Sequence, residues 1–530
     1  MPRTPQETTS VWQDATLLRG DEPLAGARRE LLADTQVCVI GAGIAGLTTA
    51  YLLQRAGAQV QVLDAAPGLC AGETGRTTAH LSAVLDDDFC ELERLFEPAG
   101  ARLAASSHAA AIDCIEAIVQ AESIQCDFER LDGLLVAAEP GQRARLEKES
   151  DALRRAGFSA MQPQHSLRTE DILIDGPALR FPRQAAFHVG RYMHGLARVF
   201  TGRGGHLVFD ARAVEAKGGR SAHIRLDSGA RLGAQHVVVA TNTPFNDRVT
   251  MHTKQAAYRT YVVGFEVPKD SFPAALLWDM AEPYHYVRRV RGVDHDVVIV
   301  GGEDHKTGQA DNAAERYQRL EQWARARFSM LGATRYRWSG QLMEPVDALG
   351  FIGRNPRDDG NVYIITGDSG DGMTHGTIGG MLISDLVAGR VNPWERLYDP
   401  ARKSVRAVGT YLGENANFVG HMVRDWVKGG EVHDRADIAP GEGAVLREGL
   451  STHAVYRDPS GELHELSAVC THLGCLVQWN GGEKSWDCPC HGSRFAIDGA
   501  VLNGPASAPL RAIEPATTPP SGSERPQPRA

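Results

Sequence analysis

Short apolar runs alternate with amphipathic stretches over most of this chain. Residues 36–40 form a β-branched apolar run, residues 47–56 show the helical period, and residues 59–63 form a second apolar run. Short apolar runs of this length are typical of buried strands. The order of strand, helix and strand predicts a βαβ unit, in which a helix joins two parallel strands.

Two further helices and a β-meander are predicted downstream. Polar and apolar positions follow the helical period at residues 89–122 and 147–156. Three apolar runs at residues 206–214, 223–226 and 235–240 are short and separated by turn residues. This spacing predicts three strands that follow one another in one sheet.

The next part of the chain, from residue 250 to 345, is rich in short strands. Runs at residues 259–267 and 295–301 favour strands, and residues 312–329 favour a helix. We expect an antiparallel sheet here. Beyond it, a strand at residues 361–366 leads through a glycine-rich turn into an apolar helix that reaches Leu386.

The turn after the first predicted strand carries a G-x-G-x-x-G motif with glycines at Gly41, Gly43 and Gly46. Asp64 ends the second strand, about 20 residues further on, where an acid binds ribose hydroxyls. In this context the glycines let the backbone approach a pyrophosphate, whose charge the helix N-terminus favours. A glycine-rich turn without nucleotide is the alternative, but the complete strand–turn–helix–strand–acid unit favours a dinucleotide.

A second concentration of chemistry lies near the C-terminus. Cys470 and His472 form a C-x-H pair, and Cys488 and His491 form a C-x-x-H pair. Two thiolates and two imidazoles suit a [2Fe–2S] cluster, and they also satisfy tetrahedral zinc. The spacing disfavours zinc, because each His closely follows its Cys and two further Cys stand in the same segments.

This segment resembles the Rieske [2Fe–2S] signature, in the form found in respiratory quinol-oxidising complexes. The resemblance implies that Cys470 and Cys488 bind one iron and that His472 and His491 bind the other. It also implies a disulfide between the two cluster loops, formed by Cys475 and Cys490.

The same resemblance implies how the cluster potential is set. Ser493 stands where relatives place a hydroxyl donor to cluster sulfur, and Phe495 stands where high-potential members carry Tyr. Hydrogen bonds to sulfur raise the potential, so we expect an intermediate value here. His472 and His491 are expected at an exposed tip from which electrons leave.

The N-terminal element order resembles the glycine-oxidase/D-amino-acid-oxidase-like FAD oxidoreductases, roughly from Thr35 to Arg390. The resemblance implies an α/β Rossmann-like FAD-binding domain with an antiparallel-sheet substrate cap. His80 is similar in position to the His that is covalently linked to the flavin in some relatives. Its spacing from the turn at Gly75 does not match theirs well, which favours FAD bound non-covalently. The implied FAD-binding residues are Gly41, Gly43, Gly46, Asp64, Arg76, Thr77, Thr78, Gly367, Asp368, Gly372, Met373 and Thr374.

The predicted organisation has five parts. These are a polar leader (1–34), the FAD-dependent part (35–395, with the cap at about 80–200 and 250–345), a helical connector (396–429), an all-β Rieske domain (430–513) and a disordered Pro/Ser-rich tail (514–530). A chain of 530 residues is too long for one core, which agrees with several domains.

The net charge and the hydropathy of the chain exclude some classes of binding partner and some locations in the cell. A net charge of −10 argues against nucleic acid and against anionic membrane surfaces. The chain has no apolar run long enough to cross a bilayer and no apolar segment typical of a secretory signal. We therefore expect a cytoplasmic protein.

The resemblance implies oxidation of an amine or amino acid, with electrons passed singly through the cluster to an external acceptor. Tyr286 and Glu344 are candidates for positioning the substrate. Relatives often bind a substrate carboxylate with Arg, yet none stands between Arg337 and Arg354, which favours a cationic amine. The rival is an NAD(P)H-dependent, ferredoxin-reductase-like flavoprotein, which needs a second dinucleotide motif that the sequence lacks. A Rieske oxygenase needs a 2-His-1-carboxylate iron site, which no segment shows clearly.

Overall fold

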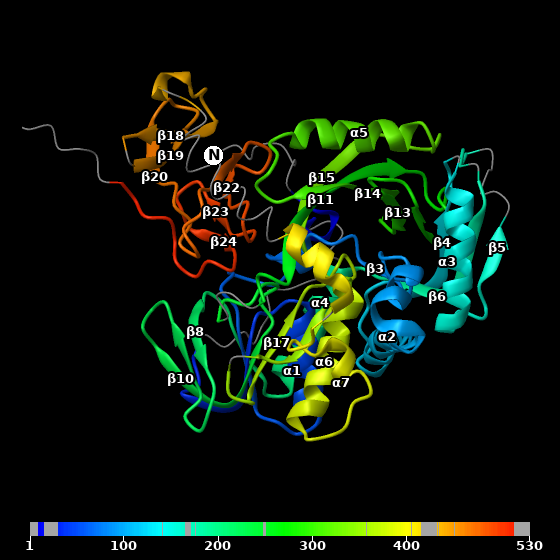
Figure 1. Ribbon diagram of the computed structural model, residues 1–530, viewed down its shortest axis with the longest axis horizontal. Coiled ribbons are helices and arrows are strands. Elements are labelled where there is room, and N and C mark those ends of the chain that lie inside the picture. The colour runs from blue at the N-terminus through cyan, green and yellow to red at the C-terminus, as the bar shows by residue number, and fades with distance from the viewer. Residues whose placement is uncertain are drawn as a thin grey trace, which may run out of the picture.

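The computed structural model describes residues 9–14, 30–139, 141–164, 171–174, 176–246, 251–356, 358–403, 405–414, 432, 434–449 and 451–513. Figure 1 shows three regions: a sheet at the bottom that contains β8, β10 and β17, a second sheet beside α5, and a C-terminal β-domain at the upper left. The predicted tail (514–530), most of the leader and residues 415–429 of the predicted connector lie outside the described residues.

The first sheet has eight strands, and its main path runs β16-β17-β10-β1-β2-β7. Neighbours from β17 to β7 are parallel, whereas β16, β8 and β9 pair antiparallel. The bounds are β1 Asp34–Ile40, β2 Val60–Leu63, β7 His206–Val208, β8 Ala213–Lys217, β9 His223–Leu226, β10 Arg231–Val239, β16 Phe351–Arg354 and β17 Val362–Thr366. The predicted βαβ unit is confirmed, and the predicted 206–214 strand is two strands, β7 and β8.

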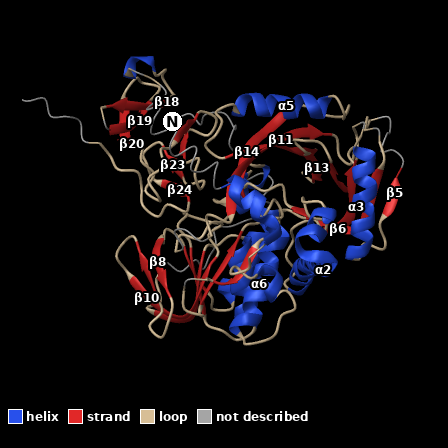
Figure 2. Ribbon diagram, viewed as in Figure 1, coloured by secondary structure: helices blue, strands red, loops and turns tan. Residues whose placement is uncertain are grey.

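Helices cover this sheet, as Figure 2 shows in blue near α6. They are α1 (Ile44–Arg55), α4 (Val189–Gly202) and α6 (Gly372–Val387). α1 and α6 pack closely. Gly380 on α6 permits this, since a Cβ there would lie only 3.0 Å from the backbone nitrogen of Thr49 on α1. β2 is buried along its whole length, as expected for a parallel strand covered on both faces.

The second sheet has nine strands in the order β15-β11-β14-β13-β12-β4-β6-β3, with β5 beside β6. Every pairing is antiparallel except that of β12 with β4, which is parallel. The predicted antiparallel sheet is therefore confirmed, and the one parallel pair was not predicted. The bounds are β3 His80–Leu81, β4 Glu129–Val136, β5 Gln162–Gln164, β6 Ala178–Ala186, β11 Gln255–Val267, β12 Ala275–Asp279, β13 His285–Val290, β14 Asp296–Lys306 and β15 Thr334–Pro345.

Four further helices flank these regions. α2 (Phe89–Ala121) is kinked at Glu97, next to Pro98, and packs on α3 (Gln142–Ala156). α5 (Ala313–Arg325) lies on β11 and β14, and α7 (Glu395–Tyr398) lies by β16. Within the part of the chain that the structure describes, no helix combines the length and hydropathy needed to cross a membrane.

The C-terminal domain is all-β, as predicted. Its three-stranded sheet contains β18 (Gly443–Glu448), β19 (Ser451–Arg457) and β20 (Leu463–Ser467), and its four-stranded sheet contains β21 (Gln478–Asn480), β22 (Ser485–Asp487), β23 (Arg494–Ala496) and β24 (Val501–Asn503). Trp479, Trp486 and Phe495 form the centre of its own hydrophobic core. The four Cys of this domain belong to or pack on that core, which holds the predicted cluster loops in place.

Short 3-10 turns complete the described structure: Val11–Gln13, Glu73–Gly75, Val405–Ala407 and Arg435–Asp437. The first belongs to the predicted polar leader. There Trp12 is buried and donates from its indole nitrogen to the carbonyl oxygen of Thr77 at 2.5 Å, and the Ser10 hydroxyl donates to the Gly75 carbonyl at 2.5 Å. Residues 10–12 therefore support the turn that carries the predicted FAD-binding residues 76–78.

Candidate active site and cluster site

The G-x-G-x-x-G turn can be formed only by glycine at two of its positions. Gly41 has φ +106°, and a Cβ there would lie 2.4 Å from the Ala240 carbonyl oxygen. A Cβ at Gly46 would lie 1.9 Å from the Gly41 oxygen. Gly43 is the N-cap of α1, so the helix N-terminus opens at this turn. The backbone can thus approach a pyrophosphate closely, as FAD binding requires.

Asp64 closes the nucleotide end of the site. Its carboxylate accepts from the backbone nitrogens of Ala42 at 2.6 Å and Ala66 at 2.7 Å. Burial raises its pKa, and these two hydrogen bonds act in the opposite direction. Thr74, which the sequence did not single out, accepts from the Ile44 nitrogen at 3.0 Å and so joins the next loop to the start of α1.

A cavity of about 600 Å³ begins at this turn and runs between the two sheets. Most of the predicted FAD-binding residues line it: Gly41, Gly43, Asp64, Arg76, Thr77, Thr78, Gly367, Asp368, Gly372 and Met373. Gly46 and Thr374 do not. Gly46 instead allows the turn to close, and the Thr374 hydroxyl lies 2.8 Å from Nδ1 of His108. The elongated cavity and its glycine cradle fit FAD.

Carboxyl groups gather on one part of the cavity wall, which forms its acidic end. Asp86, Asp368 and Asp371 line it, and the Tyr284 hydroxyl donates to Asp86 at 3.1 Å. Burial, reinforced by neighbouring carboxylates, raises the pKa of Asp86 and Asp368 to about 6. This end of the cavity is therefore suited to a cationic group, which would stabilise the ionised carboxylates.

Of the two catalytic candidates, Tyr286 lies on the cavity wall and Glu344 lies behind it. Tyr286 lines the cavity, and its hydroxyl lies 2.7 Å from that of Thr260. Glu344 lies behind the lining, 2.7 Å from the Ser369 hydroxyl, which also lies 3.1 Å from Asp87. One hydroxyl has a single proton to donate, so it cannot satisfy both carboxylates. Burial and the charge of Asp87 raise the pKa of Glu344 well above its ordinary value.

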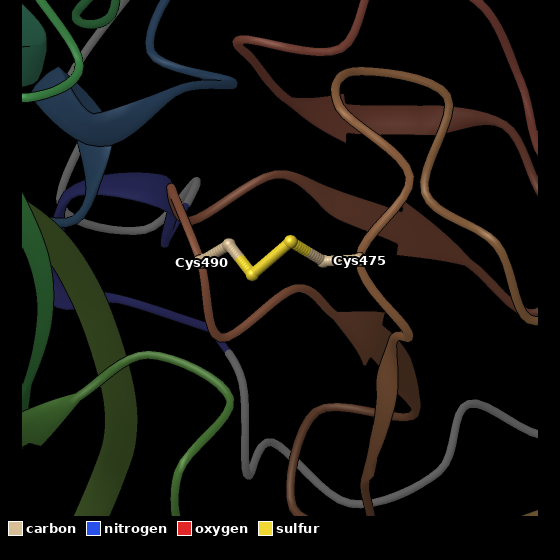
Figure 3. The surroundings of a disulfide bond; sticks show 2 residues. All are labelled: Cys475 and Cys490. Atoms are coloured by element: carbon tan, nitrogen blue, oxygen red, sulfur yellow. A yellow bond between two sulfur atoms is a disulfide. The ribbon is translucent and has the colours of Figure 1, made fainter. Parts of the chain in front are cut away.

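The four predicted cluster ligands converge between two loops of the C-terminal domain. Cys470 and Cys488 are buried with their sulfurs in contact, and the rings of His472 and His491 lie 5.0 Å apart between centroids. Figure 3 shows the disulfide between Cys475 and Cys490, which joins the two loops as the resemblance implied.

Hydrogen-bond donors surround the cysteine sulfurs, as a cluster of sulfide and thiolate requires. Cys470 accepts from the backbone of His472 and Leu473 and from the Ser493 hydroxyl. Cys488 accepts from the backbone of Cys490 and His491. Two paired thiolates, two facing imidazoles and these donors fit a [2Fe–2S] cluster.

The histidine edge of this site does not form the exposed tip that the sequence suggested. His491 is buried, and its ring centroid lies 5.6 Å from that of His252 in the N-terminal part of the chain. The His472 ring lies 4.7 Å from the same His252 ring. The correction has a tertiary cause, since the C-terminal domain packs with its histidine ligands toward the FAD-binding part.

A buried ion-pair network holds that packing. The carboxylate of Glu483 lies 2.8 Å from Arg259, 2.7 Å from Arg494 and 3.6 Å from Arg76. Burial alone would raise the pKa of Glu483, but these three guanidinium groups lower it well below its ordinary value. Neither Glu483 nor Arg259 stands in a recognisable motif, and no sequence signal pairs them.

The C-terminal domain also forms part of the cavity wall. Asn503 donates from Nδ2 to Glu73 at 2.8 Å, and Arg212 donates to the Val501 carbonyl at 2.9 Å. The C-terminal residues on the cavity are Val501, Leu502, Asn503, Gly504, Ala506 and Ser507. Residues of the C-terminal domain therefore form part of the wall of the predicted FAD cavity.

Comparison with protein families decides between the alternatives for both sites. The family model described as FAD dependent oxidoreductase matches residues 36–386. The chain belongs to this FAD-dependent oxidoreductase family. A second model, described as Rieske [2Fe-2S] domain, matches residues 428–514. The flavoprotein thus has FAD and a [2Fe–2S] cluster as its cofactors, and the zinc alternative falls away.

Individual relatives agree with this assignment. The chain is 30% identical over 516 residues to the putative Rieske 2Fe-2S iron-sulfur protein YhfW of Bacillus subtilis, covering 95% of this chain and 97% of that relative. It is 46% identical over 72 residues to the cytochrome b6-f complex iron-sulfur subunit of Synechococcus sp. (strain JA-3-3Ab), covering 13% of this chain and 42% of the subunit.

Solved structures share the fold of the flavoprotein part. Glycine oxidase from Geobacillus kaustophilus superposes with a TM-score of 0.58 at 15% identity, covering 70% of this chain and 100% of the oxidase. L-amino acid deaminase from Proteus vulgaris has a TM-score of 0.58 at 15% identity, covering 74% of this chain and 100% of the deaminase. At this identity the likeness shows the fold alone.

We expect the cluster potential to rise in a Phe495→Tyr variant. Phe495 is fully buried in the core to which Cys470 and Cys488 also belong, and it stands where high-potential relatives carry Tyr. If about 1 kcal/mol of a new charge-assisted hydrogen bond is specific to the reduced cluster, a one-electron potential rises by about 40 mV. Protein-film voltammetry at one pH measures the shift.

Ser493→Ala, which removes an existing donor to Cys470, should lower the potential. An unchanged or lower value in Phe495→Tyr, with the cluster intact, would show that residue 495 does not face a ligand sulfur.

Proposed function

We propose that this flavoprotein oxidises a small cationic amine and passes the electrons singly, through its own Rieske cluster, to an external one-electron acceptor. The observation that carries the proposal is the shared cavity. Its lining includes most of the predicted FAD-binding residues and the acidic end formed by Asp86, Asp368 and Asp371, and residues of the Rieske domain form part of its wall. Bound FAD supplies a hydride acceptor for the C–H bond beside the amine nitrogen, and the bound cluster supplies a one-electron acceptor.

The acidic end supports an amine in preference to an amino acid. Relatives of this fold include a glycine oxidase and an L-amino acid deaminase, whose substrates carry a carboxylate. Among the described lining residues the only Arg or Lys side chains are Arg76 and Arg212. Arg76 pairs with Glu483 and Arg212 donates to the Val501 carbonyl, so both hold the Rieske domain. The cavity therefore offers carboxylates to a cation and no guanidinium group dedicated to a carboxylate.

The chain's own groups bind and orient the substrate. Asp86 and Asp371 accept hydrogen bonds from the substrate ammonium group, and Tyr284 donates to Asp86. One of these carboxylates takes a proton from the ammonium group, so that the nitrogen is neutral when the hydride leaves the neighbouring carbon. Tyr286 lies on the cavity with its hydroxyl bonded to Thr260, so its ring forms an apolar wall beside the substrate carbon. Glu344 acts indirectly, because it shares the Ser369 hydroxyl with Asp87 behind the lining.

Anaerobic bleaching of the flavin tests this function. We expect diamines and other cationic amines to bleach it, and zwitterionic amino acids, NADH and NADPH to do so far more slowly. Because Asp86 has a pKa of about 6, amine affinity should fall as the pH is lowered from 7.5 to 5, where this carboxylate is protonated. Asp86→Asn should weaken amine binding by about tenfold or more, since a hydrogen bond to a charged group contributes about 1.5–3 kcal/mol.

The matched control is Asp151→Asn, which removes an exposed carboxylate paired with Arg154 on α3, away from the cavity. It should leave amine affinity unchanged. Fast stoichiometric bleaching by NADH or NADPH would favour the reductase alternative. Bleaching by amino acids alone would contradict the cationic amine.

A further inference from the structure

His252 lies at the seam between the flavoprotein part and the cluster loops. It stands shortly before β11 and is 4% exposed. Its ring meets His472 edge-on, with centroids 4.7 Å apart and planes at 74°, and meets His491 at 5.6 Å and 62°. One side chain from the flavoprotein part therefore contacts both imidazoles that hold the second iron.

The loop that carries Cys488 and His491 also packs tightly against the flavoprotein part of the chain. A Cβ at Gly492, which has φ +76°, would lie 2.3 Å from Cβ of Ala257 on β11. Gln341 on β15 donates from Nε2 to the Gly492 carbonyl at 3.0 Å. On the other side, a Cβ at Gly308 would lie 2.8 Å from the Pro489 nitrogen. The loop that carries Cys488 and His491 thus sits in backbone-to-backbone contact with the flavoprotein part.

A series of covalent bonds and hydrogen bonds leads from His252 to the FAD cavity. Gln255, three residues further along the chain, is buried and donates from Nε2 to the Thr366 hydroxyl at 3.0 Å. Thr366 lines the cavity and donates to the Asn242 carbonyl at 2.6 Å. Electron transfer is favoured by packed and hydrogen-bonded contacts over gaps, so this series is a direct route between the two cofactor sites.

We propose that His252 is a positioning residue that holds the two histidine ligands of the cluster against the flavoprotein part for electron transfer within the chain. The proposal rests on the proposed function, in which the flavin reduces the cluster of the same chain. It adds the residue at which the flavoprotein part and the Rieske domain meet. It also implies that the cluster accepts electrons while the Rieske domain is packed against the flavoprotein part as in this structure.

The test uses the full-length holoprotein in His252→Leu, which removes the ring but keeps an apolar side chain of similar size. His252→Phe restores an aromatic ring, and His236→Ala is a control at a half-buried His that contacts Tyr363, away from the cluster. The bound flavin is reduced photochemically without substrate, and reduction of the cluster is followed by its absorbance and EPR. Pulsed EPR then measures the nitrogen couplings of the two imidazole ligands.

We expect cluster reduction to be several-fold slower in His252→Leu, because the substitution removes the ring that contacts both imidazole ligands. The nitrogen couplings should also change. His252→Phe should recover most of the rate, and His236→Ala should match the wild type, all with unchanged flavin and iron content. Unchanged rate and couplings in His252→Leu would overturn the proposal, as would equal losses in His236→Ala. A wild-type cluster that photoreduced flavin does not reduce at all would instead refute the proposed function.

Discussion

Replacing His491 with alanine should abolish the Rieske-type EPR signal of this protein. His491 and His472 are the two imidazoles that face each other at the cluster site, and the loss of one leaves an iron without a ligand. The wild type should contain about two irons per chain, as one [2Fe–2S] cluster requires. Iron analysis and EPR of the dithionite-reduced protein provide the measurement.

FAD should stay bound in the His491→Ala variant. The glycine turn and Asp64 are unaffected, and the disulfide between Cys475 and Cys490 still joins the cluster loops. The matched control is His453→Ala, a buried His of the same domain that pairs with Glu465 at 3.2 Å and lies outside the ligand set. Its EPR signal should persist. A normal signal in His491→Ala, or zinc in place of iron in the wild type, would contradict the ligand assignment.

Replacing Glu483 with glutamine should destabilise the docked arrangement strongly. The substitution removes the carboxylate between Arg259 and Arg494, both of which are almost completely buried. Removing one partner of a buried ion pair costs about 3–5 kcal/mol, because the remaining charge has neither water nor a counter-ion. Arg494 keeps Asp487 at 2.9 Å, so the larger part of the loss falls on Arg259.

Chemical denaturation of the holoprotein, followed by flavin fluorescence, measures this loss. Flavin release should occur at lower denaturant concentration, because six residues of the same domain, 501–504, 506 and 507, line the FAD cavity. The control is Lys484→Gln at the adjacent position, which removes an exposed pair with Glu442 and should cost no more than about 1 kcal/mol. A Glu483→Gln variant as stable as Lys484→Gln would show that the network does not hold the domains together.

Local chemistry accounts for what the sequence by itself determined. The nucleotide turn is recognisable because Gly41 has a positive φ and a Cβ at Gly46 would collide with the Gly41 carbonyl oxygen, and both requirements arise within a few residues of the chain. The cluster ligands are recognisable because each His closely follows a Cys within one loop, so each loop brings one thiolate and one imidazole to the same cluster. The apolar runs of β1, β2 and β17 predicted a parallel sheet because strands buried on both faces have no polar alternation.

Only the tertiary structure decided how the two cofactor sites meet. His252 and His491 are far apart in the sequence, as are Arg259 and Glu483, and no periodicity or spacing connects them. The acidic end of the cavity is likewise assembled from the loop before α2 and the turn before α6. Contacts of this kind depend on how whole sheets pack, and packing depends on the shape and burial of many side chains together. The expectation of an exposed histidine tip was wrong for that physical reason: a ligand's exposure is set by the surface that covers it, which lies elsewhere in the chain.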